Sequence, residues 1–170
     1  RRAGRPLLFA ADMERGAGQQ IAGLSVLPTP MAIAAGAHAS SLACMAGRRT
    51  AVEALSVGVN LIFAPVCDVN ANPENPIINV RSFSDNPAMV ADLARHWIYG
   101  ARAAGALTSA KHFPGHGGTH EDSHLELSVG PSSRDELDRV HLLPFRAAIE
   151  AGVDSIMVAH MTVPAVDDSG

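Results

Sequence analysis

The stretch that decides the fold is NLIFAPVCD, Asn60–Asp68. It is a run of apolar residues that ends in a carboxylate, and PLLFAAD, Pro6–Asp12, has the same form. A continuous apolar run, without alternating polar residues, is typical of a parallel strand covered on both faces. We therefore expect two buried parallel strands here. Ala106–Lys111 and Asp154–His160 predict a third and a fourth strand.

Helices with recognisable ends separate these strands. Ser41–Val57 is rich in alanine and stops at a glycine, which suits a helix C-terminus. Asp85-Asn86-Pro87 offers a polar cap followed by proline in the first turn. Ser133–Glu136 has the spacing of a capping box, and Pro144 is expected to kink the helix that follows. The chain thus alternates strand and helix, which predicts an α/β fold.

Polar residues follow the ends of the expected strands, and this feature favours a barrel over a doubly wound sheet. They are Asp12, Asp68, Lys111-His112 and His160. In a (β/α)8 barrel these strand ends converge on the face that carries the active site. A full barrel needs eight strands and about 250 residues. We therefore predict a partial (β/α)8 TIM barrel, with residues 1–170 forming a single fragment that lacks the start and the last strands.

Composition excludes several classes of partner. The 170 residues are 47% hydrophobic and carry a formal net charge of −4, which argues against nucleic acid. No apolar run approaches the roughly 20 residues of a membrane span. Cys44 and Cys67 form no CxxC pair and are expected to be buried thiols. We expect a cytoplasmic protein, and because the chain starts at Arg1 without methionine an exported form stays open.

The segment Lys111–His124, KHFPGHGGTHEDSH, contains a histidine at every fourth position. Such a stripe would bind a metal only on a helix, because only helical backbone brings these positions to one face. The proline and the glycines between the histidines exclude a continuous helix. We therefore expect neither a metal nor a cofactor. His116 and His120 have no predicted role.

Asp122 and His124 suggest acid–base chemistry instead. A carboxylate that accepts from one imidazole nitrogen orients the ring and favours its protonated form. The other nitrogen is then free to exchange a proton with a substrate. Asp-x-His occurs often by chance, however, so the pair alone does not decide the function.

The whole segment resembles the signature of bacterial β-N-acetylglucosaminidases of glycoside hydrolase family 3, which reads approximately KHFPGHGDTxxDSH. AADMERG, NLIFAPVCDVNANPENPIINVRSFSDNP and DSIMVAHMTVPAVD resemble further blocks of that family in order and spacing. The resemblance implies a glycosidase that removes terminal β-linked N-acetylglucosamine with retention, in cell-wall or amino-sugar turnover. It also implies that Asp122 and His124 form the acid/base dyad, on a barrel that needs a separate nucleophilic carboxylate.

Further residues match the family's sugar contacts, and the implied partner is a small carbohydrate. Lys111 and His112 match hydroxyl contacts, Arg81 matches an arginine on the sugar ring, and Asp12 matches a carboxylate that accepts from hydroxyls. Neighbours on a regular strand point to opposite faces, so Lys111 and His112 require irregular backbone to reach one sugar. The alternatives are a surface salt bridge for Arg81 and a helix cap for Asp12.

Two other strand-end residues are less decided. His160 either lines the pocket or satisfies a strand end. Asp68 is expected to be structural and to order the loop at Asn70–Pro76.

The sequence also departs from the family pattern. Gly118 stands where an aspartate is common, and Gln20 stands where a second arginine is common. The family's nucleophilic aspartate follows a strand beyond Val153–Met161, and Asp167 and Asp168 lie too close to that strand to replace it. We therefore expect the 170 residues alone to be inactive. A family 3 β-glucosidase, a phosphorylase and a non-catalytic sugar-binding barrel remain as alternatives.

Overall fold

The computed structural model describes residues 7–119, 128–131 and 133–167. Its main sheet has four strands in the order β1 (Ala10–Ala11), β2 (Leu61–Ile62), β3 (Leu107–Phe113) and β5 (Ser155–Val158). Every neighbouring pair in this sheet is parallel. The four predicted strands and their direction are therefore confirmed. A small parallel pair, β4 (Ser128–Val129) with β6 (Met161–Thr162), has no counterpart in the sequence-based prediction.

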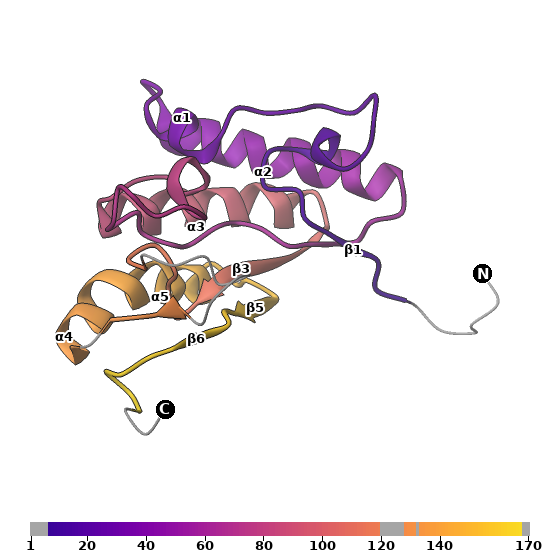
Figure 1. The fold of residues 1–170 in the computed structure, drawn as a ribbon. Helices are drawn as coiled ribbons and strands as arrows, with labels where there is room; N and C mark the ends of the chain where they lie inside the picture. Colours follow the sequence, from indigo (N-terminus) through magenta and orange to yellow (C-terminus); the bar gives the residue numbers. More distant parts are fainter. Residues whose placement is uncertain (1–6, 120–127, 132, 168–170) are drawn as a thin grey trace.

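Helices cover one side of the sheet, as Figure 1 shows. The longer ones are α2 (Ala39–Ser56), α3 (Pro87–Ala103) and α5 (Leu142–Glu150). The short elements are α1 (Pro30–Ala34), α4 (Arg134–Glu136), the 3-10 helices η1 (Ala17–Gln19) and η2 (Asn79–Arg81), and the π-helical turn η3 (Leu137–His141). Strand–helix alternation around a parallel sheet makes the fold a partial (β/α)8 barrel.

Helices α2 and α3 pack closely because each presents a glycine to the other. A Cβ on Gly47 would lie 2.0 Å from the carbonyl oxygen of Trp97, and a Cβ on Gly100 would lie 1.9 Å from that of Cys44. Either side chain would push the two backbones apart. The apolar stripe of α3, which includes Val90 and Leu93, is buried in the same core.

The predicted helix ends are confirmed where the structure describes them. Asn86 accepts hydrogen bonds from the backbone N–H groups of Ala88 and Met89, with Pro87 in the first turn of α3. Ser133 accepts from the backbone N–H of Glu136. The regular helix is interrupted by η3 just before Pro144, whose ring nitrogen offers no donor to the preceding turn.

The burial predicted for the first strand is wrong. Leu7, Leu8 and Phe9 expose 48%, 66% and 57% of their surface, whereas Ile62 in β2 is fully buried. Within the described residues, β1 lies at the edge of the sheet and pairs with β2 alone, which leaves its other side uncovered. No helix of the described residues is both long and apolar enough to cross a membrane.

Candidate active site

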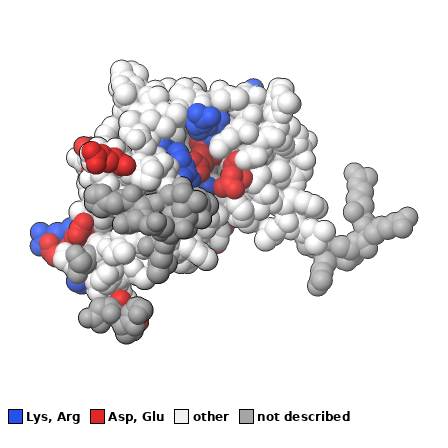
Figure 2. Space-filling model, in the orientation of Figure 1, with Lys and Arg blue, Asp and Glu red and all other residues white. Residues whose placement is uncertain are grey.

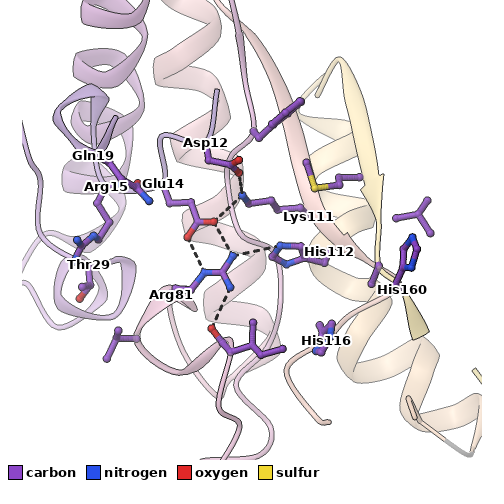
Figure 3. Close-up of a pocket in the computed structure, with 16 residues that line it drawn as sticks. Asp12, Glu14, Arg15, Gln19, Thr29, Arg81, Lys111, His112, His116 and His160 are labelled. Atoms are coloured by element: carbon purple, nitrogen blue, oxygen red, sulfur yellow. Dashed lines mark hydrogen bonds and ion pairs between the residues drawn. The ribbon is translucent and has the colours of Figure 1, made fainter. Parts of the chain in front are cut away.

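A polar cavity of about 770 Å³ opens at the carboxyl ends of the strands. Acidic and basic side chains gather in this hollow on the face shown in Figure 2. Five of the seven predicted site residues line it, and Figure 3 shows their arrangement. These five are Asp12, Arg81, Lys111, His112 and His160. The segments that supply them are far apart in sequence, and the parallel sheet brings their ends together.

One wall of the cavity is a cluster of four charged side chains, Asp12, Glu14, Arg81 and Lys111, named here the ionic cluster. The Lys111 ammonium lies 2.5 Å from Asp12 Oδ1 and 2.7 Å from Glu14 Oε1. Arg81 donates from Nε to Glu14 Oε2 at 2.9 Å and from Nη2 to Glu14 Oε1 at 2.8 Å. Two carboxylates thus balance two cations, and the cluster has no net charge.

Glu14 is the buried centre of the ionic cluster. Its side chain is 6% exposed, whereas that of Asp12 is 51% exposed. Burial by itself would raise the pKa of the Glu14 carboxyl, but the hydrogen bonds from Arg81 and the charge of Lys111 outweigh it and lower the pKa to about 2. Glu14 is therefore ionised at neutral pH.

Lys111 and His112 reach the same cavity because the backbone of β3 is irregular between them. The register with β5 shifts between Lys111 and Phe113. The ladder therefore skips His112, and the side-chain alternation of a regular strand does not apply there. The irregularity that the sequence required is present.

A second wall is formed by His112 and His116, which buried Asp68 holds from behind. These three residues are named here the histidine wall. The Asp68 carboxylate lies 2.7 Å from His112 Nδ1 and accepts the backbone N–H of His116 at 2.6 Å. Burial would raise the pKa of Asp68, but these hydrogen bonds hold it below its ordinary value. Because a carboxylate only accepts hydrogen bonds, His112 Nδ1 carries a proton and donates it in a hydrogen bond to Asp68. The other ring nitrogen, Nε2, lies 3.4 Å from Arg81 Nη2.

Asp68 is structural, as expected, because its buried carboxylate holds His112 and His116. Among the described contacts, its side chain does not order the loop at Asn70–Pro76. Buried Asn75 does so instead, since its Oδ1 accepts from the backbone N–H groups of Ile77 and Ile78. Its amide also donates to the carbonyl oxygens of His116 and Thr119. His116, which had no predicted role, is buried and lines the cavity.

Other predicted positions are placed as follows. His160 lines the cavity, which is the first of its two expected roles. Gln20 is exposed, and a Cβ on Gly118 would lie 3.2 Å from Cε1 of buried His141. Asp122 and His124 lie outside the described residues. Among those that the structure describes, no group of three His, Cys, Asp or Glu side chains could hold a metal ion.

Sequence reasoning missed Glu14, although a signal was present. Residues i and i+2 of an extended segment point to the same side, and Glu14 follows Asp12 by two positions. This spacing could have pointed to a second carboxylate beside Asp12, although the structure places Glu14 in a turn just after β1. The contacts that tie Asn75 to the turn after β3 had no comparable signal, because the carbonyl oxygens that accept from its amide lie more than 40 residues away.

A parallel α/β sheet with a polar cavity at its carboxyl end has the organisation of (β/α)8-barrel enzymes. The sequence matches the Glycosyl hydrolase family 3 N terminal domain over residues 1–170. The chain therefore belongs to glycoside hydrolase family 3.

Known proteins agree with this assignment. The chain is 49% identical over 118 residues to beta-hexosaminidase A of Pseudoalteromonas piscicida, which covers 69% of this chain and 20% of that protein. The solved structure of a family 3 beta-N-acetylglucosaminidase from Paenibacillus sp. str. FPU-7 matches with a TM-score of 0.91 and 43% identity, over 96% of this chain and 31% of that one. The beta-glucoside phosphorylase BglX matches with a TM-score of 0.88 and 38% identity, over 95% and 29%. The chain spans a fifth to a half of the length of the curated relatives it matches.

Proposed function

We propose that the full-length protein is an exo-acting glycosidase that removes terminal β-linked N-acetylglucosamine with retention, in cell-wall or amino-sugar turnover. The observation that carries this proposal is the cavity at the strand ends, where the two carboxylates and two cations of the ionic cluster balance and Arg15 adds a further donor to the lining. An uncharged sugar presents hydroxyls that need both donors and acceptors. The names of similar proteins, a beta-hexosaminidase and a beta-N-acetylglucosaminidase, support the amino sugar.

The cavity residues can divide the work of holding the sugar. Half-exposed Asp12 uses Oδ1 on Lys111, and its second oxygen can accept from a sugar hydroxyl. Lys111 has three N–H donors, and the two carboxylates of the ionic cluster use two of them. His112 is oriented by Asp68, and its Nε2 faces Arg81 Nη2 at 3.4 Å, so a sugar hydroxyl that donates to Nε2 would share it with Arg81. These contacts suit recognition of one terminal residue.

The chemical step is assigned to Asp122 and His124. His124, protonated beside Asp122, would donate its proton to the departing glycosidic oxygen, and the neutral imidazole would then activate water against the glycosyl-enzyme. The family resemblance puts the nucleophilic aspartate beyond Val153–Met161. We therefore expect that the 170 residues expressed alone do not turn over an aryl β-N-acetylglucosaminide, while the full-length protein does. Turnover by the 170 residues would contradict this assignment of the nucleophile.

Replacement of His124 by alanine in the full-length protein tests the dyad. Hydrolysis of a substrate with a poor leaving group should fall at least ~10²-fold, the usual worth of acid–base catalysis. An activated aryl glycoside needs less protonation, so cleavage of its glycosidic bond should fall less. His96→Ala, on α3 and outside the cavity, is the control and should leave both rates unchanged. Equal, small losses on both substrates would exclude His124 as the acid. Wild-type binding of N-acetylglucosamine without turnover would favour a non-catalytic sugar-binding protein.

Phosphorolysis of a β-glucoside is a second candidate, because the similar structure of BglX belongs to a beta-glucoside phosphorylase. Neutral imidazole repels phosphate less than a carboxylate would, which suits either acceptor. Product analysis with and without inorganic phosphate separates the two reactions. A sugar 1-phosphate as the main product would replace hydrolysis in the proposal.

A further inference from the structure

We propose that Glu14 is a positioning residue that holds Arg81 and Lys111 in the sugar-binding geometry and keeps anions out of the cavity. The inference rests on the proposed function, because it assigns a role within the same cavity. It concerns a side chain that lies behind the predicted sugar contacts rather than among them.

The contacts of Glu14 point inward. Oε1 receives Lys111 Nζ at 2.7 Å and Arg81 Nη2 at 2.8 Å, while Oε2 receives Arg81 Nε at 2.9 Å. Both oxygens are thus engaged, and Figure 3 shows the carboxylate between the two cations. Glu14 therefore affects substrate binding indirectly, by holding Arg81 and Lys111 in place.

These contacts join three separate segments. Glu14 follows β1, Arg81 belongs to η2 and Lys111 belongs to β3. Arg81 donates twice to Glu14 in a planar contact, and its Nη1 also donates to the Ile77 carbonyl at 3.1 Å, so Glu14 supplies the charged part of a fixed orientation. Glu14 consequently sets the distance between two donors that have no shared backbone element.

The charge of Glu14 decides which ligands the cavity accepts. With Glu14 ionised, the cluster is neutral, and Arg15 is the further cation among the residues that line the cavity. Without the Glu14 charge, the cluster would carry one net positive charge in addition to that of Arg15. A cation pair in a cavity with low-dielectric walls concentrates anions. Arginine and lysine side by side are also suitable donors for an oxyanion such as sulfate. Glu14 thus favours an uncharged sugar over an anion.

Two substitutions separate position from charge. Glu14→Gln keeps the side-chain length, removes the charge and turns an NH2 group towards donors. Glu14→Asp keeps the charge but is one methylene shorter, so it cannot hold both cations in the same place. Glu53→Gln is the matched control, because Glu53 is a buried carboxylate on α2 that pairs with Arg49 and does not line the cavity.

The experiment measures KM and kcat for an aryl β-N-acetylglucosaminide with the full-length protein, with sulfate exchanged for chloride at constant ionic strength. Wild type and the Glu53→Gln control should be insensitive to sulfate. Glu14→Gln should raise KM at least ~10-fold, in line with the loss of charged hydrogen bonds, and sulfate should inhibit it competitively. Glu14→Asp should raise KM and remain insensitive to sulfate.

Calorimetric titration with sulfate needs no turnover and keeps the two proposals distinguishable. Sulfate binding to Glu14→Gln but not to wild type supports the role of Glu14 even if the wild type does not hydrolyse the glycoside, in which case the proposed function fails. Unchanged KM together with absent sulfate binding in Glu14→Gln overturns the inference. If thermal melting reveals that Glu14→Gln is unfolded, Glu14→Asp decides, and an unchanged KM in that variant has the same meaning.

Discussion

The ionic cluster and the histidine wall each contain a buried carboxylate, but they stabilise it differently. Glu14 is neutralised by two full positive charges, whereas Asp68 is fully buried and held by N–H donors of His112 and His116. When an ion pair at the cavity is broken, the remaining charge can be compensated by a solvent ion or by a change in protonation. When a buried acceptor is removed, water cannot reach the donors that it leaves unpaired. We therefore expect Asp68 to matter most for folding, and the ionic cluster to matter more for ligand binding.

Replacement of Asp68 by alanine should lower the free energy of unfolding more than any substitution in the ionic cluster. The change leaves the His112 ring N–H and the His116 backbone N–H without their acceptor in a buried place. Loss of one partner in such an arrangement costs about 3–5 kcal/mol. Chemical denaturation of the full-length protein measures the free energy of unfolding. Asp85→Ala, at an exposed position, is the control and should change it by no more than about 0.5 kcal/mol. Equal losses in both variants would contradict the role given to Asp68.

Acid should reveal the charge dependence of the ionic cluster. The pKa of Glu14 is about 2 in the folded protein and 4.5 for an ordinary glutamate. A lowered folded-state pKa means that the ionised carboxylate stabilises the protein fully above pH 4.5 and that this contribution disappears as the pH falls through about 2. The difference between wild type and Glu14→Gln should therefore shrink by up to about 3 kcal/mol over this window.

The measurement is a series of denaturation curves for both proteins across that window. Glu74→Gln, at an exposed position, is the control, and its difference from wild type should stay nearly constant. A wild-type advantage over Glu14→Gln that persists undiminished at the acid end would mean that the ionised form of Glu14 is not what stabilises the cluster.

Within the ionic cluster, Asp12 should have the smallest effect on folding. Its side chain is half exposed, and its buried partner Lys111 keeps a second carboxylate, Glu14, when Asp12 loses its charge. Asp12→Asn should therefore melt close to wild type, while KM for the proposed glycoside rises. Thermal melting and steady-state kinetics on one preparation check both statements. A large loss of stability with unchanged KM would contradict the assignment of ligand binding to the ionic cluster and of stability to the histidine wall.

The fold was largely predictable because its signals are local. Apolar runs gave the strands of the parallel sheet, and Asn86 with Pro87 gave the start of α3. The cavity residues at strand ends followed from the same pattern, since Asp12, Lys111 and His160 all lie there.

Features that depend on distant partners were not predictable. An apolar run does not tell how many neighbours a strand has, so the exposure of Leu7–Phe9 was missed. Nothing near Asp68 in sequence indicates that its carboxylate holds His112, which lies 44 residues away. Asn75 was hidden for the same reason, because its two acceptors belong to the turn after β3.

The span of the ionic cluster along the chain has a consequence for the order of folding. Arg81 meets Glu14 across 67 residues, and Lys111 meets Asp12 across 99. Contacts that close such long loops form only after much chain entropy has been lost. The packing of α2 on α3 closes a shorter loop, so it can form earlier. We expect the cluster to be absent from the transition state, so substitutions in it should speed unfolding and leave the folding rate nearly unchanged.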